Sequence, residues 1–283
     1  MKKVFFLFTT LFLFTCFICN NSIAPKEKVT NSATDSSAKA IIDTATNLPD
    51  SIAQPLPAPD SIAASERKYI YLTFDDGPLY GSNNIDKIIR AEKINTDVFV
   101  VGMHAMNDPE LLSFYQLYQS NPYVEIGNHS YTHANNRYKK YYQNPDGVVE
   151  DFMKCESALQ IPTRFARQPG RNQWRLEGIK KDDIRSGTES ADLLYENGFK
   201  VFGWDVEWQH YGNGIPTQTV DQLVRTIEQK LDNGKTVKPG HLIILTHDEM
   251  FRTKSGSNAL QQLIEKLKAT GKYRFEHLSK YPA

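Results

Sequence analysis

Cysteine is nearly absent from this sequence, and neither sign of charge is in excess. Only three of the 283 residues are cysteines. Cys16 and Cys19 lie in an apolar run at the N-terminus, which leaves Cys155 as the one thiol in the rest of the chain. A single thiol can build neither an internal disulfide nor a thiolate zinc site, so both are excluded there. The 33 basic and 33 acidic residues balance, and net charge therefore gives no support for a nucleic-acid partner.

The first 24 residues have the layout of a secretory signal. Two lysines precede an uncharged apolar run over residues 4–19, which is short for a membrane span. Three outcomes stay open: cleavage after Ala24 despite Pro25, lipid attachment at Cys16 as in a bacterial lipoprotein, or an uncut anchor. In each case we expect an exported bacterial protein, located in the periplasm, on the outer face of the cell envelope, or secreted.

The composition changes twice after this segment. Residues 25–66 are rich in Ser, Thr, Ala and Pro, and the pentapeptide PDSIA occurs there twice. Such a segment cannot bury enough apolar surface to offset its ordering entropy, which predicts a disordered linker. Residues 67–283 are expected to form a single domain.

Short apolar runs alternate with amphipathic stretches throughout this domain. Seven runs are strand candidates: residues 68–74, 96–102, 123–128, 163–168, 200–206, 241–247 and 273–278. Apolar residues recur at helical spacing between them, for example over 220–231 and 260–267. This alternation is typical of a parallel α/β domain, either barrel-like or doubly wound.

Polar side chains that could take part in catalysis or metal binding follow several of the predicted strands. They are Asp75, Asp76, His129, His133, Arg167, Asp205, Glu207, His247 and Asp248. The carboxyl ends of parallel strands meet at one edge of a sheet, so these residues can be neighbours. His129 and His133 are four residues apart, a spacing that lets both imidazoles face one way on a helical turn. With a carboxylate they could form an open zinc site, although two surface histidines in a loop remain an alternative.

Five motifs resemble one known family. TFDDGP, HSYTH, ARQPG, WDVEW and LTHD occur in the order expected of the polysaccharide deacetylases, also called carbohydrate esterase family 4. The resemblance covers the chain from about Lys68 to the C-terminus. It implies a distorted (β/α) barrel of about seven parallel strands in one catalytic domain, an acetylated glycan as substrate, and a divalent metal. Zinc is the first expectation, with cobalt or nickel as substitutes.

The same resemblance implies a role for individual residues. The expected metal ligands are Asp76, His129 and His133. Asp75 is similar to the family's general base, and Arg167 to the arginine that holds this base. His247 is similar to the general acid that protonates the leaving amine.

Two motifs depart from the family pattern. No aromatic residue separates Pro169 from Gly170, so the backbone amide that stabilises an oxyanion must come from Gly170 or Arg171. In WDVEW, Glu207 is the favoured residue to orient the catalytic histidine, with Asp205 as a rival.

Trp208, beside Glu207, is expected to line the acetyl pocket. Tyrosines in the loop 135–147 could stack on sugars, but a solvated loop is an equal alternative.

Three functions stay open on this basis. The favoured one is metal-dependent removal of acetyl groups from N-acetylated sugars of a polysaccharide or envelope glycan. The others are an O-acetyl esterase acting on a polysaccharide such as acetylated xylan, and a non-catalytic glycan-binding relative. The oligomeric state is left open.

Overall fold

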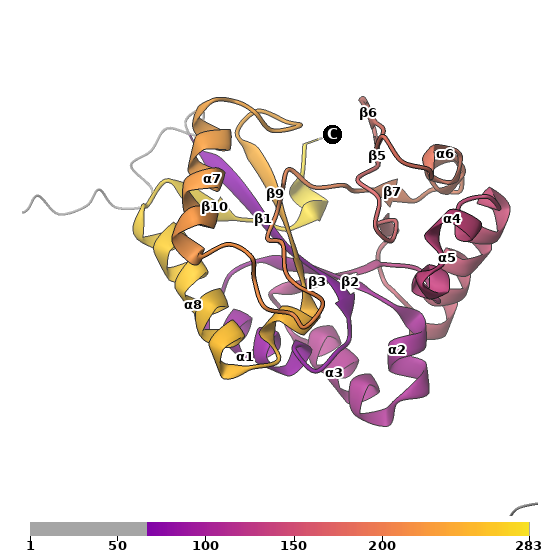
Figure 1. The fold of residues 1–283 in the computed structure, drawn as a ribbon, viewed down its shortest axis with the longest axis horizontal. Helices are drawn as coiled ribbons and strands as arrows, with labels where there is room; N and C mark the ends of the chain where they lie inside the picture. The colour runs from indigo at the N-terminus through magenta and orange to yellow at the C-terminus, as the bar shows by residue number, and fades with distance from the viewer. Residues whose placement is uncertain (1–66, 283) are drawn as a thin grey trace, which may run out of the picture. The chain divides into compact units, whose positions relative to one another are not determined.

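The computed structural model describes residues 67–282 (Figure 1). The strands are β1 (Lys68–Gly77), β2 (Thr96–Val100), β3 (Val124–Asn128), β4 (Phe165–Ala166), β5 (Trp174–Leu176), β6 (Ile179–Lys181), β7 (Lys200–Val201), β8 (Val206–Glu207), β9 (His241–His247) and β10 (Tyr273–Phe275). The helices are α1 (Ser82–Glu92), α2 (Gly102–Asn107), α3 (Pro109–Ser120), α4 (Tyr138–Tyr141), α5 (Pro145–Leu159), α6 (Thr188–Glu196), α7 (Val220–Asp232) and α8 (Lys254–Ala269). Short 3-10 turns are η2 (His133–Asn136), η3 (Asp248–Phe251) and η4 (Leu278–Lys280).

All the strands belong to one sheet with the order β6-β5-β7-β4-β3-β2-β1-β9-β8, and β10 pairs with the start of β1. Pairing is parallel except where β5 meets β6 and β7. The end strands β6 and β8 do not pair with each other, so the curled sheet is an open barrel. The expected α/β barrel is confirmed, with each of the seven predicted runs containing a strand.

The helices cover the outside of this sheet in a continuous series. Contacts link α7 to α8, α8 to α1, α1 to α3, α3 to α2, α2 to α5 and α5 to α6. Their buried faces follow the apolar spacing of the sequence: α7 buries Leu223, Ile227 and Leu231. Thr219 caps α7 by accepting a hydrogen bond from the Gln222 amide, which explains where this helix begins.

One predicted strand is wrong in its extent. The run 200–206 forms two strands, β7 and β8, which lie in different parts of the sheet. Between them the chain crosses the interior of the barrel at Gly203, where an added Cβ would overlap the side chains of Asn172 and Trp174. The Asn172 side chain also bonds both the amide and the carbonyl of Trp204, at 3.0 and 2.9 Å. This close passage needs glycine and ends the strand.

The predicted signal segment 1–24 and linker 25–66 lie outside the described residues. Among the helices of residues 67–282, none has the length and apolar character to cross a membrane.

Candidate active site

The two aspartates at the end of β1 occupy different environments. Asp75 is 2% exposed and lies opposite His247 in the register of β1 with β9. Asp76 is partly exposed and has a left-handed backbone with φ of 70°. The pairing of β1 with β2 shifts register between Phe74 and Gly77, so this left-handed residue at an irregular strand end separates the two side chains.

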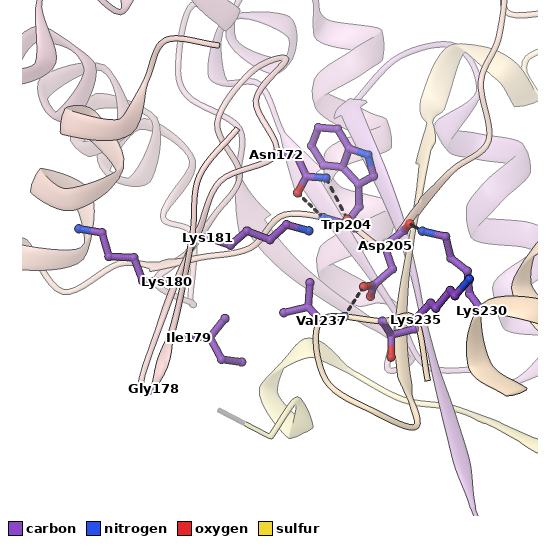
Figure 2. A pocket seen from close by; sticks show the side chains of 11 residues that line it. Asn172, Gly178, Ile179, Lys180, Lys181, Trp204, Asp205, Lys230, Lys235 and Val237 are labelled. Carbon is purple, nitrogen blue, oxygen red and sulfur yellow. Dashed lines mark hydrogen bonds between the residues drawn. The ribbon is translucent and has the colours of Figure 1, made fainter. Parts of the chain in front are cut away.

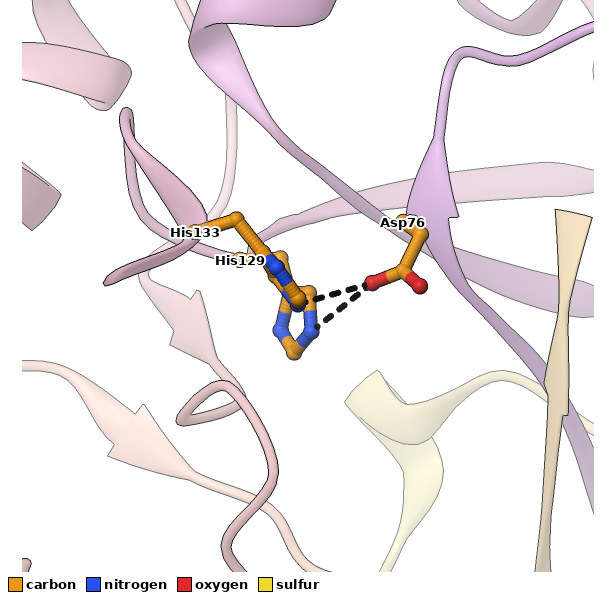
Figure 3. A group of neighbouring side chains, drawn as sticks. All are labelled: Asp76, His129 and His133. Atoms are coloured by element: carbon orange, nitrogen blue, oxygen red, sulfur yellow. Dashed lines mark ion pairs between the residues drawn. The ribbon is translucent and has the colours of Figure 1, made fainter. Parts of the chain in front are cut away.

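Asp76 faces two imidazoles (Figure 3). Its Oδ1 lies 3.4 Å from His129 Nε2 and 3.0 Å from His133 Nε2. His129 Nδ1 is 2.7 Å from the Arg167 carbonyl oxygen and donates to it, which leaves the lone pair of Nε2 directed at Asp76. Asp76 Oδ1 is buried and has no hydrogen bond of acceptable geometry. Two imidazole nitrogens around an unsatisfied carboxylate oxygen fit a divalent cation.

The charges of this group influence one another strongly. Burial raises the pKa of Asp76, but the close imidazoles of His129 and His133 outweigh burial and hold this pKa well below its usual range. Burial lowers the pKa of His129, and the carboxylates of Asp75 and Asp76 outweigh it, so the net shift is upward.

The two histidines are not on a helical turn, which corrects the geometry expected from their spacing. Ser130 and His133 both have left-handed φ values, 69° and 50°. Asn128 Oδ1 accepts a hydrogen bond from the Ser130 amide at 2.9 Å, and Ser130 Oγ accepts one from the His133 amide at 3.0 Å. These turns, rather than a helix, bring the two ring centroids to 5.1 Å.

A second group of ligand-type side chains lies at the other ends of β2 and β3. It consists of Asp97, Glu125 and His277. Asp97 accepts hydrogen bonds from the Leu278 amide, and Glu125 accepts them from the amide and hydroxyl of Ser279. These carboxylates already have protein donors, so the Asp76 group is the better fit to a metal.

Arg167 is fully buried and holds Asp75 in place. Its Nη1 is 2.7 Å from Asp75 Oδ1 and from Thr73 Oγ1. Its remaining donors reach the carbonyl oxygens of Phe202 and Gly203, both at 3.1 Å. Arg167 is therefore not a surface ion-pair partner, because its guanidinium is buried and bonded to Asp75.

His247 ends β9 beside Asp75. Its Nδ1 is buried without a hydrogen-bond partner, and its ring meets that of His210 edge to face at 4.8 Å between centroids. Burial lowers the pKa of His247, and Asp76 and Asp75 raise it less. Glu207, expected to orient this histidine, lies in the same pocket, but no hydrogen bond joins the two side chains among the described residues.

In the fourth motif, the structure decides the role of Asp205, which was left open, and corrects the expectation for Trp208. Asp205 is a structural residue, because its carboxylate accepts the amides of Val237 at 2.7 Å and Ile243 at 2.9 Å. Trp208 does not line the acetyl pocket: it is 0% exposed and donates its indole N–H to the Gln218 carbonyl.

Strand alternation explains the burial of Trp208. Trp208 directly follows β8 and continues its alternation, so Trp208 is buried while Glu207 faces the pocket, and the indole that lines the pocket belongs to Trp204.

The structure narrows the choice of oxyanion donor. The Arg171 amide donates to the Gln168 carbonyl at 3.1 Å, so it is already used. Gly170 lines the pocket with φ of 63°, and its amide has no backbone acceptor among residues 67–282. Of the two expected donors, Gly170 is the one that remains free.

The pocket that contains these groups has a volume of about 170 Å³. Its lining also includes Tyr138 and Arg185, neither of which was singled out as an individual site residue from the sequence. Tyr138 belongs to the tyrosine-containing loop noted above, and its ring stands perpendicular to His133 at 5.9 Å. Arg185 comes from a polar loop whose sequence has no periodicity, so no signal pointed to it.

Part of the sequence is similar to a known family and to several known proteins. Residues 63–182 match the family described as polysaccharide deacetylase. A peptidoglycan-N-acetylglucosamine deacetylase of Bacillus cereus is 27% identical over 77% of this chain and 72% of its own length. A chitin disaccharide deacetylase of Vibrio alginolyticus is 22% identical over 69% of this chain, which spans only 65% of that relative.

A solved structure shares the fold. A CE4 esterase from Streptococcus mutans superposes with a TM-score of 0.56 at 21% identity, covering 74% of this chain and 85% of its own. The matched sequence segment contains β1, with both aspartates, as well as His129, His133 and Arg167. Over residues 63–182 the chain is therefore similar to the polysaccharide deacetylase family.

Proposed function

We propose that this protein is a metal-dependent hydrolase that removes acetyl groups from N-acetylated sugars of a polysaccharide or cell-envelope glycan. The observation that carries the proposal is the placement of the Asp76, His129 and His133 group beside Asp75, which Arg167 holds, in one pocket with His247. The printed activities of the two curated relatives, both deacetylases of N-acetylated glycans, support the same reaction.

Asp76, His129 and His133 would hold the cation, with zinc first and cobalt or nickel as substitutes. Such a cation supplies Lewis acidity that activates water and polarises an amide carbonyl. The sugar acetamide would enter the pocket past Trp204 and Tyr138, both of which line it.

The chain's own residues divide the proton transfers. Asp75 would accept a proton from the attacking water, and the buried guanidinium of Arg167 holds this carboxylate in place through a 2.7 Å hydrogen bond to Oδ1. The amide of Gly170 would donate to the oxygen that becomes negative in the tetrahedral stage. His247 would give a proton to the departing sugar amine, because an amine leaves poorly as an anion.

Acetate release tests this proposal. The full protein should release acetate from a hexamer of N-acetylglucosamine, lose this activity on chelation, and regain it with zinc or cobalt. Asp75→Asn should lower kcat by about 10²- to 10⁴-fold, whereas the exposed Asp221→Asn should leave it unchanged. Full activity in Asp75→Asn would refute the assignment of the base.

One observation keeps ester hydrolysis as a second candidate. The Nδ1 of His247 has no partner, so the proposed acid is not held by a carboxylate, and an ester needs that acid less than an amide does. Acetate release from acetylated xylan, compared with release from the N-acetylglucosamine hexamer, separates the two reactions.

We also propose that the protein is exported, to the periplasm, the outer envelope face or the medium. The signal-like residues 1–24 support this. Fractionation of cells that produce the full chain tests it, and recovery in the cytoplasm alone would refute it.

A further inference from the structure

The open side of the barrel contains a cavity larger than the candidate active-site pocket. It has a volume of about 640 Å³ and lies between the unpaired sheet ends, with β6 on one side and the approach to β8 and α7 on the other (Figure 2). We call this cavity the seam groove. Residues that line it include Lys181 of β6, Trp204, Lys230 and Lys235.

Positive charge exceeds negative charge in the lining of the seam groove. Lys181 and Lys235 are exposed and have no ion-pair partner among residues 67–282. Lys230 Nζ donates to the Asp205 backbone carbonyl at 2.6 Å, a neutral acceptor that leaves the ammonium charge in place. The Asp205 carboxylate is the acidic side chain of the lining, and both its oxygens accept backbone amides.

A fourth lysine of the lining provides a contrast. Lys180 Nζ is 2.9 Å from Asp192 Oδ1, so its charge is already paired. In Figure 2 its side chain points away from the groove, whereas that of Lys181 extends toward Trp204. The alternation of side chains along β6 produces this difference.

The seam groove and the candidate active-site pocket share a wall. Trp204 lines both cavities, and Arg185, four residues after Lys181, lines the pocket beside Asp75 and His247. A sugar chain whose acetamide enters the pocket would therefore continue over the indole into the seam groove. Planar aromatic surfaces of this kind combine apolar contact with a polar edge and suit sugar rings.

We propose that the seam groove binds carboxylate-bearing sugars of the glycan strand that is deacetylated. This inference rests on the proposed function and defines its substrate class more narrowly, as an acidic glycan. The chain as a whole has no net charge, so the excess of lysine is local to this groove. Lys181 and Lys235 would bind the carboxylates at the exposed end of the strand, with Lys230 deeper.

Two substrates and three variants test the proposal. The substrates are a hexasaccharide of alternating N-acetylglucosamine and glucuronic acid, and the neutral N-acetylglucosamine hexamer. The variants of the full protein are Lys181→Gln, Lys235→Gln and, as matched control, Lys180→Gln. Each exposed contact with a carboxylate should contribute about two- to fivefold, so the double variant K181Q/K235Q should lose about 4- to 25-fold in kcat/KM on the acidic substrate.

The neutral substrate should be hydrolysed equally by all variants, and Lys180→Gln should match the wild type on both. Raising the salt concentration should weaken turnover of the acidic substrate alone, because exposed charges are screened. Equal effects of K181Q/K235Q on both substrates would overturn the proposal.

Binding separates failure of this inference from failure of the proposed function. If neither substrate releases acetate, the proposed function is wrong. Calorimetric titration with the acidic hexasaccharide then still shows whether the seam groove binds this glycan. Weaker binding to K181Q/K235Q than to wild type or Lys180→Gln supports the seam groove. Equal binding to all of them refutes it.

Discussion

At the scale of single residues, we expect substitution of one member of the buried Arg167–Asp75 pair to lower the free energy of unfolding strongly. Both side chains are almost inaccessible to water, and each satisfies the other. An ion pair of this kind can stabilise little relative to apolar packing, but removal of one partner leaves the other charge buried and uncompensated.

Arg167→Met should therefore lower the free energy of unfolding by about 3–5 kcal/mol. Asp75, and the carbonyl oxygens of Phe202 and Gly203, would lose their donors. Urea denaturation measures the change. Arg185→Met, at an exposed arginine of the same pocket, should change it by under about 1 kcal/mol. Equal effects of the two substitutions would contradict this account of Arg167.

Zinc should raise the melting temperature of the wild-type protein, since a ligand that binds only the folded state stabilises it by about 2.7 kcal/mol at 100 times Kd. His133→Ala removes one of the three ligands, and the shift should disappear. His277→Ala, in the second group of ligand-type side chains, should retain it. If His277→Ala abolishes the zinc-dependent rise in melting temperature and His133→Ala retains it, zinc binds at the opposite end of the sheet.

Zinc binding should also weaken with acid. Burial lowers the pKa of His129 but Asp75 and Asp76 raise it above the ordinary 6.5, and an imidazole must lose its proton to bind a metal. Affinity should thus decline as the pH falls through this raised pKa, by about tenfold per pH unit for one proton displaced.

Titration of zinc at several pH values measures this decline. Asp75→Asn removes one of the two carboxylate charges that raise the pKa of His129, so the decline should begin at lower pH in this variant. If zinc affinity begins to decline at the same pH in Asp75→Asn as in the wild type, Asp75 does not determine that pH.

At the scale of elements, the crossing between β7 and β8 decides which side chains reach the pocket. Gly203 lets the chain pass close to Asn172 and Trp174. This passage determines which of the following side chains face the pocket and which face the core. Trp204 and Glu207 come to the pocket, whereas Trp208 goes to the core.

Gly203→Ala should lower the free energy of unfolding by about 1–3 kcal/mol, because the new methyl group overlaps neighbours that have no room to move. Thermal or urea denaturation checks the value. Gly178→Ala is a suitable control for added bulk, since nothing lies within 4 Å of its Cβ position, although its φ of 71° adds strain of its own. A Gly203→Ala protein as stable as wild type would show that the crossing is not tightly packed.

At the scale of the whole molecule, long apolar runs made most of the barrel predictable. β1 and β9 are buried over most of their length, and their sequences show it directly. β5, β6 and β8 have only two or three residues each, too few for any periodicity. Their positions depend on the tertiary fold, and so the open side of the barrel could not be foreseen.

The candidate site was likewise predictable from the sequence only in part. The grouping of Asp76 with His129 and His133 followed from their motifs, which sit at strand ends. The exchange of Trp208 for Trp204 could not be read from the sequence, because it depends on where the chain crosses the barrel. The structural use of Asp205 likewise depends on amides of a distant strand and loop.

The central position of β1 has a consequence for the order of folding. β1 is the first strand of the described domain, yet it pairs with β9 and β10, and Thr73 bonds a carbonyl oxygen 171 positions away. Until the last third of the chain is made, β1 has one open edge, and contacts of such long range form slowly. His247 comes with that last third, so during synthesis Asp76, His129 and His133, the proposed metal ligands, emerge first and the proposed acid is added only when the barrel is complete.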